Sequence, residues 1–244
     1  MRTLIVGASA GLGRALAEEL ARRGHNLGLL ASDGRDLAPL CTDLALRFGT
    51  HAVPIVVDLY NLDAGMVRAV VLNALGGLDK LIYVAGWSVA KVDSGPIHDA
   101  LAERLMSVNF EAAVRLINAF LPDLQDDPNG SITVISTVAS ARARGRNTVY
   151  AASKHGMEFY VHGLRHYLAK HPCRTQVFRA GYLDTRMNFG ESRRFPKLAP
   201  AVAARVIADR LGDDIALAYV PRRWALIMTV INLLPWIMFR RMKI

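Results

Sequence analysis

The sequence contains little cysteine and has no pattern of metal ligands. Among its 244 residues there are 2 cysteines, Cys41 and Cys173, too few for the disulfide framework of a small secreted domain. No cluster of cysteine and histidine has the spacing of a zinc site, so we expect no metal. No secretory signal is expected either, because Met1 and Arg2 lead directly into a short apolar run and a glycine-rich loop. These absences predict a cytoplasmic protein with reduced thiols.

Acidic residues are scarce relative to basic ones. The chain has 30 Lys and Arg against 21 Asp and Glu, a formal net charge of +9. It lacks the aromatic–basic motifs and finger spacings of nucleic-acid-binding proteins, so we expect no nucleic-acid partner. The excess charge then favours anionic ligands or a membrane surface. With 52% hydrophobic residues the chain has enough apolar side chains for a folded core, which excludes a disordered protein.

Short, almost continuously apolar runs alternate with segments of helical periodicity. Such runs are typical of strands covered on both faces of a parallel sheet. The alternation predicts an α/β fold with a doubly wound, seven-stranded parallel Rossmann-like sheet in a single domain. Residues 1–221 would form this domain and residues 222–244 an apolar C-terminal tail. Helices are expected at Gly13–Arg23 and Ala100–Leu121, and strands at Thr3–Val6, Asn26–Leu30, Ala52–Val57, Lys80–Val84, Ser131–Ser136, Thr175–Arg179 and Ala216–Val220.

A glycine-rich loop joins the first predicted strand to the first helix. It has the pattern G-x-x-x-G-x-G at Gly7, Gly11 and Gly13. Small residues in such a loop let the backbone approach a diphosphate, whose charge is stabilised by free N–H groups at the helix N-terminus. A tight strand-to-helix turn would need the same residues, but the position at the first strand–helix junction favours a dinucleotide site.

The end of the second strand distinguishes the two nicotinamide cofactors. An acidic residue there would bind the ribose 2′-hydroxyl of NAD and repel the 2′-phosphate of NADP, and this sequence has Ala31 instead. Ser32 could hydrogen-bond a phosphate, and Arg35 or Arg14 could neutralise it. Asp33 would favour NAD if its side chain turned inward. The sequence therefore favours NADP and leaves NAD open.

A tyrosine and a lysine lie four residues apart at the start of a predicted helix. This spacing puts Tyr150 and Lys154 on one helix face. The neighbouring ammonium is expected to lower the pKa of the phenol from its usual value near 10, which would suit it to acid–base catalysis. Thr137 ends the fifth strand, where its hydroxyl could hydrogen-bond a substrate carbonyl, whereas Ser136 should point to the opposite face. Asn109 is a polar residue in an otherwise apolar helical stretch.

Together these residues resemble the short-chain dehydrogenase/reductase family over nearly the whole chain. The family's glycine motif matches Gly7, Gly11 and Gly13, and its catalytic Tyr–Lys pair matches Tyr150 and Lys154. The resemblance implies a hydride transfer between a nicotinamide cofactor and a carbonyl or alcohol substrate.

The resemblance also implies roles for individual residues. Tyr150 would exchange the proton, Thr137 would orient the substrate oxygen, and Lys154 would hold the nicotinamide ribose. Asn109 falls on the family's helix-bending asparagine and would anchor a water relay to Lys154. The cofactor would contact Gly7, Ser9, Ala10, Gly11, Leu12, Gly13, Ser32, Asp58, Leu59, Ala85, Gly86, Tyr150, Lys154, Gly181, Leu183 and Thr185.

Two other functions are compatible with the sequence. The chain could be a sensor that binds NADP without catalysis, although the set of Thr137, Tyr150 and Lys154 argues against this. It could also be a structural protein of the membrane surface, in which case the tail would matter and Tyr150 would not.

Two basic segments flank the predicted cleft. One runs from Ala141 to Arg146, and the other contains Arg193, Arg194 and Lys197. They are consistent with an anionic substrate or with an ordinary solvated basic surface.

The tail and one helix face are candidates for contacts outside the domain. The apolar stretch Trp224–Phe239 is short for a membrane span and is interrupted by Pro235. A segment lying in the membrane interface and a contact with another subunit remain the main alternatives; an interfacial tail would favour a lipid-like substrate. The apolar stripe of Met157, Val161, Leu164 and Leu168 is expected to form a dimer face, as the family resemblance implies for a homodimer or homotetramer, with burial in the chain's own core as the alternative.

Overall fold

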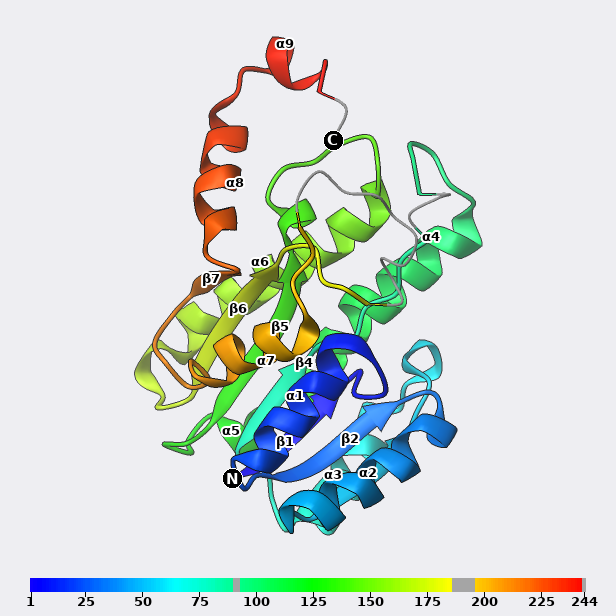
Figure 1. Cartoon of the computed structure of the whole chain (residues 1–244), viewed down its shortest axis with the longest axis vertical. Helices are drawn as coiled ribbons and strands as arrows, with labels where there is room; N and C mark the ends of the chain where they lie inside the picture. Colours follow the sequence, from blue (N-terminus) through cyan, green and yellow to red (C-terminus); the bar gives the residue numbers. More distant parts are fainter. Residues whose placement is uncertain (90–92, 186–195, 243–244) are drawn as a thin grey trace.

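The apolar runs of the sequence form one parallel sheet in the computed structural model, which describes residues 1–89, 93–185 and 196–242. The strand order is β3-β2-β1-β4-β5-β6-β7, and every neighbouring pair is parallel. The order reverses between β1 and β4, which is the arrangement of a doubly wound sheet (Figure 1). The predicted fold class is therefore confirmed. The strands are β1 (Arg2–Val6), β2 (Asn26–Ala31), β3 (Ala52–Val56), β4 (Lys80–Tyr83), β5 (Ser131–Thr137), β6 (Arg174–Ala180) and β7 (Leu217–Val220).

Helices cover both faces of the sheet. One face is packed by α1 (Gly11–Arg22), α2 (Gly34–Phe48) and α7 (Pro200–Ala208), whose leucines, isoleucines and alanines form one buried cluster with the sheet. The other is packed by α3 (Ala64–Leu75), α5 (Ala112–Leu124) and α6 (Thr148–Tyr167), which form a second cluster. Burial on both faces explains why the strands are apolar almost throughout.

The long helix predicted between residues 100 and 121 is interrupted. It consists of α4 (Asp99–Met106), a π-helical turn η2 (Ser107–Glu111) and α5. A π turn inserts an extra residue into the helical ladder and bends the helix, and Asn109 lies within it. The described residues also contain three short 3₁₀ turns, namely η1 (Leu59–Asn61), η3 (Val138–Ser140) and η4 (Leu168–Lys170).

The apolar stripe predicted as a subunit interface belongs to the core of the single chain. Met157, Val161, Leu164 and Leu168 are all buried and pack with α5 and the sheet. The prediction was wrong because helical periodicity shows that a face is buried but not which element buries it.

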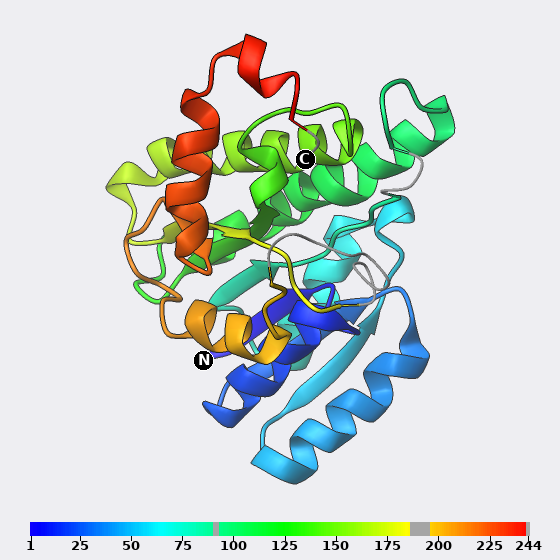
Figure 2. The ribbon, with the colours of Figure 1, turned by 45° about the horizontal axis from the view of Figure 1, so that its top comes forward.

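The C-terminal tail forms two helices that pack beyond the carboxyl ends of the strands (Figures 1 and 2). Pro235 separates α8 (Arg223–Leu233) from α9 (Trp236–Phe239). Trp224 and Met228 are buried against Val138. Among the described residues, no helix has both the length and the apolar character that a membrane span requires.

An arginine from the loop after η3 binds the tail. The Arg142 guanidinium donates hydrogen bonds to the carbonyls of Ile231 and, at 2.7 Å, Leu234, and it lies 3.9 Å from the centre of the Phe239 ring. These carbonyls are at the C-terminal end of α8, where backbone acceptors lack helical partners and a cation is favourable. The tail is thereby held next to the loop that precedes α6.

Candidate active site

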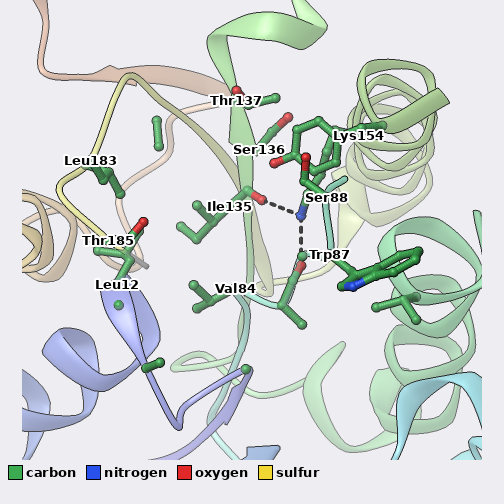
Figure 3. Close-up of a pocket in the computed structure, with 18 of the residues that line it drawn as sticks. Leu12, Val84, Trp87, Ser88, Ile135, Ser136, Thr137, Lys154, Leu183 and Thr185 are labelled. Carbon is green, nitrogen blue, oxygen red and sulfur yellow. Dashed lines mark hydrogen bonds between the residues drawn. The ribbon is translucent and has the colours of Figure 1, made fainter. Parts of the chain in front are cut away.

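A cavity of about 490 Å³ lies at the carboxyl ends of the central strands. It extends from the glycine loop and the end of β2, past β4 and β5, to the start of α6. Ligands of open α/β sheets bind at this edge, where the strand order reverses. Figure 3 shows Leu12, Val84, Thr137, Lys154 and Thr185 around it, contributed by segments far apart in the sequence.

The glycine loop is shaped for a close ligand contact. Gly7 has φ +91°, and a Cβ there would lie 2.7 Å from the backbone of Ala85. A Cβ on Gly13 would lie 2.0 Å from the carbonyl oxygen of Gly7. At the start of α1, Ala10 offers no side-chain cap, so the N–H groups of the first turn remain available to a ligand. The shape of this loop fits a diphosphate, as predicted. Gly13 packs against the backbone of Gly7 and does not line the cavity.

The end of β2 presents Ala31 and Ser32 to the cavity. Asp33 does not turn inward, because its carboxylate caps α2 by accepting hydrogen bonds from the backbone N–H and the guanidinium of Arg35. These bonds lower the pKa of Asp33 to about 2. Arg35 is thus bound to Asp33. Ser32 lines the cavity and could hydrogen-bond the 2′-substituent of the cofactor ribose.

The other predicted cofactor residues surround the same space. Asp58 accepts a hydrogen bond from the N–H of Tyr60 at 3.1 Å with one carboxylate oxygen, which leaves the other oxygen for a ligand. The remaining members all line the cavity, namely Ser9, Ala10, Gly11, Leu12, Leu59, Ala85, Gly86, Gly181, Leu183 and Thr185.

Lys154 is buried at the base of the cavity. Its Nζ donates to the carbonyl oxygens of Ala85 at 2.8 Å and Ile135 at 3.1 Å, as the dashed lines of Figure 3 show. An ammonium has three donors, so one remains for a ligand. Burial lowers the pKa of Lys154 to about 7, although the carboxylate of Glu158, one turn further along α6, acts in the opposite direction.

The phenol of Tyr150 lines the cavity on the same helix face, but its pKa differs from the prediction. Burial raises the pKa of Tyr150 to about 12. The expectation that its pKa would be lowered was wrong, because removal of the phenol from water penalises the phenolate. Tyr150 is therefore protonated at neutral pH.

Thr137 ends β5 with its hydroxyl at the cavity. Its Oγ1 accepts a hydrogen bond from the N–H of Ala139 at 3.2 Å, so the hydroxyl proton is left to donate elsewhere. Ser136 also lines the cavity, contrary to the prediction for an ideal strand, because the chain turns into η3 at this point. Its Oγ donates to Ser140 at 3.3 Å.

Asn109 does not line the cavity. Its side-chain amide accepts from the N–H of Trp87 at 2.7 Å and donates to the carbonyl of Trp87 at 2.9 Å. It thus fixes the segment that follows β4, beside Gly86 and Lys154. Each end of the amide makes one of these bonds, and its second N–H and second lone pair remain, so the link to Lys154 through water stays a prediction.

Comparison with known proteins agrees with this geometry. The family model described as short chain dehydrogenase matches residues 2–194. The chain belongs to the short-chain dehydrogenase family.

Curated relatives of this short-chain dehydrogenase carry oxidoreductase names. A hydroxysteroid 11-beta-dehydrogenase 1-like protein of Xenopus tropicalis is 33% identical over 192 residues, which are 76% of this chain and 65% of that protein. An uncharacterized oxidoreductase of Mycobacterium bovis is 31% identical over 230 residues, 90% of this chain and 64% of the relative. The chain thus spans slightly less than two thirds of the length of these two relatives.

Solved structures share the fold. A metagenomic short-chain oxidoreductase in complex with NADP has a TM-score of 0.75 at 25% identity, with 90% of this chain and 96% of that chain covered. A blue fluorescent protein from a metagenomic library, in complex with NADPH, has a TM-score of 0.80 at 23% identity and covers 89% of this chain and 94% of its own.

The start of α6 in this short-chain dehydrogenase is held by a residue that the sequence did not reveal. The fully buried carboxylate of Asp93 accepts hydrogen bonds from the N–H groups of Val149 at 3.1 Å and Tyr150 at 2.9 Å, and from the hydroxyl of Thr148 at 2.8 Å. A carboxylate at this end of a helix satisfies free donors and complements the helix dipole. Asp93 therefore fixes the backbone of Tyr150 itself.

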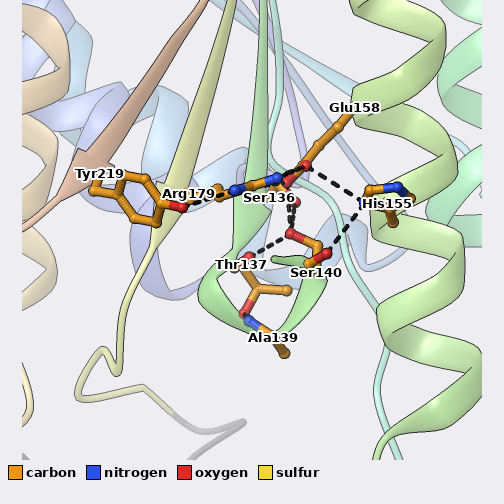
Figure 4. A network of polar contacts seen from close by, with 8 residues as sticks. All are labelled: Ser136, Thr137, Ala139, Ser140, His155, Glu158, Arg179 and Tyr219. Atoms are coloured by element: carbon orange, nitrogen blue, oxygen red, sulfur yellow. Dashed lines mark hydrogen bonds and ion pairs between the residues drawn. The ribbon is translucent and has the colours of Figure 1, made fainter. Parts of the chain in front are cut away.

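A buried ionic network is hydrogen-bonded to η3 through Ser140 (Figure 4). Arg179 on β6 forms a salt bridge of 2.6 Å with Glu158 on α6 and a hydrogen bond of 2.7 Å to the hydroxyl of Tyr219. Ser140 connects the network to the site, because its Oγ lies 2.6 Å from both the Glu158 carboxylate and the carbonyl oxygen of Thr137. The network links β6 and α6 to the turn that carries Thr137.

Two arginines of the first basic segment make different contacts in the structure. Arg142 binds the tail, whereas Arg144 lines the cavity. Arg193 and Arg194 lie outside the described residues. Sequence reasoning also missed other cavity-lining residues, namely Trp87, Ser88, Arg104, Val108, Asn147 and Tyr182.

Proposed function

We propose that this short-chain dehydrogenase transfers hydride between NADP(H) and a carbonyl or alcohol substrate. The observation that carries the proposal is that Thr137, Tyr150 and Lys154 line the same cavity as the glycine loop. NADP is supported by Ser32 at the end of β2, by the engagement of Asp33 with Arg35, and by the NADP and NADPH in the similar structures. NAD remains the alternative cofactor.

The residues of the site have complementary roles in this proposal. NADPH, when bound, supplies the hydride that reduces the carbonyl carbon. Tyr150 donates its phenolic proton to the carbonyl oxygen, and the hydroxyl of Thr137 donates a hydrogen bond to the same oxygen and orients it. In its charged form, Lys154 keeps one N–H free for the nicotinamide ribose.

The raised pKa of Tyr150 favours the reductive direction at neutral pH. A general acid must carry its proton when the substrate arrives, and a phenol with a pKa of about 12 does so almost completely at pH 7. Oxidation of an alcohol needs the phenolate, which is rare under the same conditions. Carbonyl reduction is therefore the direction in which the form of Tyr150 that prevails at neutral pH is the reactive one.

The test is oxidation of NADPH and of NADH by the full-length protein with a panel of aliphatic and aromatic ketones. The proposal predicts turnover of at least one ketone, with higher kcat/KM for NADPH. Binding of NADPH without turnover of any ketone would instead identify a cofactor sensor.

The proposal includes a cytoplasmic location with peripheral contact to a membrane. The outward side of the tail exposes Leu226, Leu233, Trp236 and Ile237. Arg222 and Arg223 precede these residues and Arg240 and Arg241 follow them. Exposed apolar side chains with cationic flanks are typical of segments that lie in the interface of an anionic membrane.

A homodimer is also part of the proposal, on a different face from the one first expected. Phe159 is 77% exposed on the outward side of α6, and Tyr167 is exposed at the end of the same helix. Large exposed aromatic side chains on one helix are favourable for packing against a second copy.

A further inference from the structure

Arg144 lies in the wall of the catalytic cavity, and its buried Nε has no hydrogen-bond partner among the residues that the structure describes. It belongs to the loop between η3 and α6. Its neighbour Arg142 is occupied by the tail. A buried donor that is unpaired costs free energy, so such groups in native proteins commonly serve a ligand.

A second unpaired polar group lies three residues further on. Asn147 is 7% exposed, has φ +58° and lines the same cavity, and its Oδ1 is buried without a partner. A side-chain amide can either accept or donate a hydrogen bond at a ligand. Two unsatisfied polar groups on one loop indicate a polar subsite in this part of the cavity.

The wall that contains Arg144 is shared with a second, apolar cavity of about 50 Å³. This extension lies between η3 and the tail, and its apolar lining consists of Val138, Ala139, Trp224, Met228, Ile231 and Phe239. Ala139, Arg144 and Tyr182 line both cavities. The catalytic cavity and the apolar space under the C-terminal helices are therefore neighbours, with the Arg144 side chain in the wall that they share.

The charge of the cavity agrees with an acidic ligand. Asp58 is the only carboxylate among its described lining residues, against Arg104, Arg144 and Lys154. Asp58 belongs to the β3–η1 end of the cavity, whereas Arg144 borders the extension under the tail. Arg104 stacks on Trp87 at 5.0 Å, whereas Arg144 is the one of these three cations that borders both described cavities.

We infer that the substrate is a carbonyl or alcohol compound with an acidic group and a hydrocarbon part, whose acidic group is bound by Arg144 with Asn147 beside it and whose hydrocarbon part enters the extension beneath α8 and α9. This inference rests on the proposed function for the position of the reacting carbonyl. The subsite itself can be tested without turnover.

The test is calorimetric titration of the full-length protein, in excess NADP⁺, with octanoate. Octanamide serves as a probe of similar shape without charge, and acetate as a probe without the hydrocarbon chain. We expect octanoate to bind at least about tenfold more tightly than either probe, because a charge-assisted hydrogen bond and apolar burial then act together. Arg144→Gln should weaken octanoate binding at least about tenfold and leave octanamide binding unchanged.

The matched control is Arg115→Gln, which removes the same charge from the exposed side of α5. It should leave octanoate binding unchanged. The Tm of Arg144→Gln should equal or exceed that of the original protein, since Arg144 has no partner to lose. The inference is overturned if octanoate and octanamide bind alike, if no binding occurs, or if both arginine variants behave like the original protein. These results are independent of whether any ketone is reduced, so failure of the subsite and failure of the proposed reaction are distinguishable.

Discussion

At the scale of single residues, burial controls the chemistry of the site more than the charge of a neighbour does. The pKa of Lys154 is lowered to about 7 and that of Tyr150 is raised to about 12, both through desolvation. Each shift favours the neutral form of its group. The identity and spacing of the two residues were readable from the sequence. Their pKa values were not, because burial depends on the strands and loops that enclose the cavity.

The raised pKa of Tyr150 predicts an asymmetric pH dependence. In alcohol oxidation the phenolate is the base, so its fraction, and with it kcat, should rise about tenfold per pH unit below the pKa. Initial rates of oxidation between about pH 8 and pH 10 test this, since Lys154, with its pKa of about 7, is then already largely neutral. An oxidation rate that is level over this interval would contradict the raised pKa.

At the scale of secondary-structure elements, the sequence was most informative where a pattern is local. All seven strands were predicted to within about two residues, because burial on both faces leaves a continuous apolar run. Elements that depend on distant partners were not predicted from periodicity, and the bend at Asn109 was expected only from the family resemblance. The π turn around Asn109 is bound to Trp87, and the start of α6 is bound to Asp93, which is 57 residues before Tyr150. No short-range periodicity reports such contacts.

Removing the cap of α6 should impair both stability and catalysis. Asp93→Ala leaves the N–H groups of Val149 and Tyr150 without their acceptor, and we expect a loss of about 1–3 kcal/mol in the free energy of unfolding. It should also lower kcat by about tenfold or more, because Tyr150 is then less precisely placed.

The control for this change is a cap far from the site. Asp63 caps α3 by accepting from the N–H of Met66 at 2.9 Å. Asp63→Ala should cost about 1 kcal/mol of stability and leave kcat unchanged. Denaturant titration and steady-state kinetics of both variants provide the comparison. Equal kcat values for the two variants would show that Asp93 stabilises the helix without positioning Tyr150.

At the scale of the whole molecule, the tail both lines the apolar cavity beside the site and carries an exposed apolar surface. Trp224, Met228 and Phe239 face inward, whereas Leu226 and Trp236 are 71% and 68% exposed. The sequence showed the apolar composition of this segment but not its division into two sides, because that division depends on the position of η3 and Arg142. If the exposed side of the tail binds a membrane, the cavity that its other side lines lies close to the membrane surface.

Membrane contact is tested by flotation with vesicles that contain anionic lipid. The full-length protein should float with the vesicles, and the double variant Leu226→Glu, Trp236→Glu should stay in the soluble fraction, because two charges oppose burial in the interface. Leu46→Glu is the control, since Leu46 is 82% exposed on α2 and outside the tail. Absence of the full-length protein from the vesicle fraction would contradict a peripheral membrane role.

Self-association is tested by light scattering. The protein should have the mass of a dimer or tetramer, and Phe159→Glu should reduce it to the mass of a monomer, because a carboxylate in an apolar interface is costly. The same Leu46→Glu variant should keep the larger mass. A monomeric mass at all concentrations would contradict the proposed homodimer.

The central claim is that Tyr150 transfers a proton to a substrate oxygen beside bound NADPH, and the most direct measurement is a comparison of Tyr150→Phe with the original protein. NADPH binding is followed by fluorescence titration, and turnover by NADPH oxidation with the best ketone. The account predicts an unchanged Kd for NADPH and a loss of about a hundredfold or more in kcat, because phenylalanine keeps the ring and removes the proton donor. Equal kcat for the two proteins, with NADPH bound in both, would contradict it.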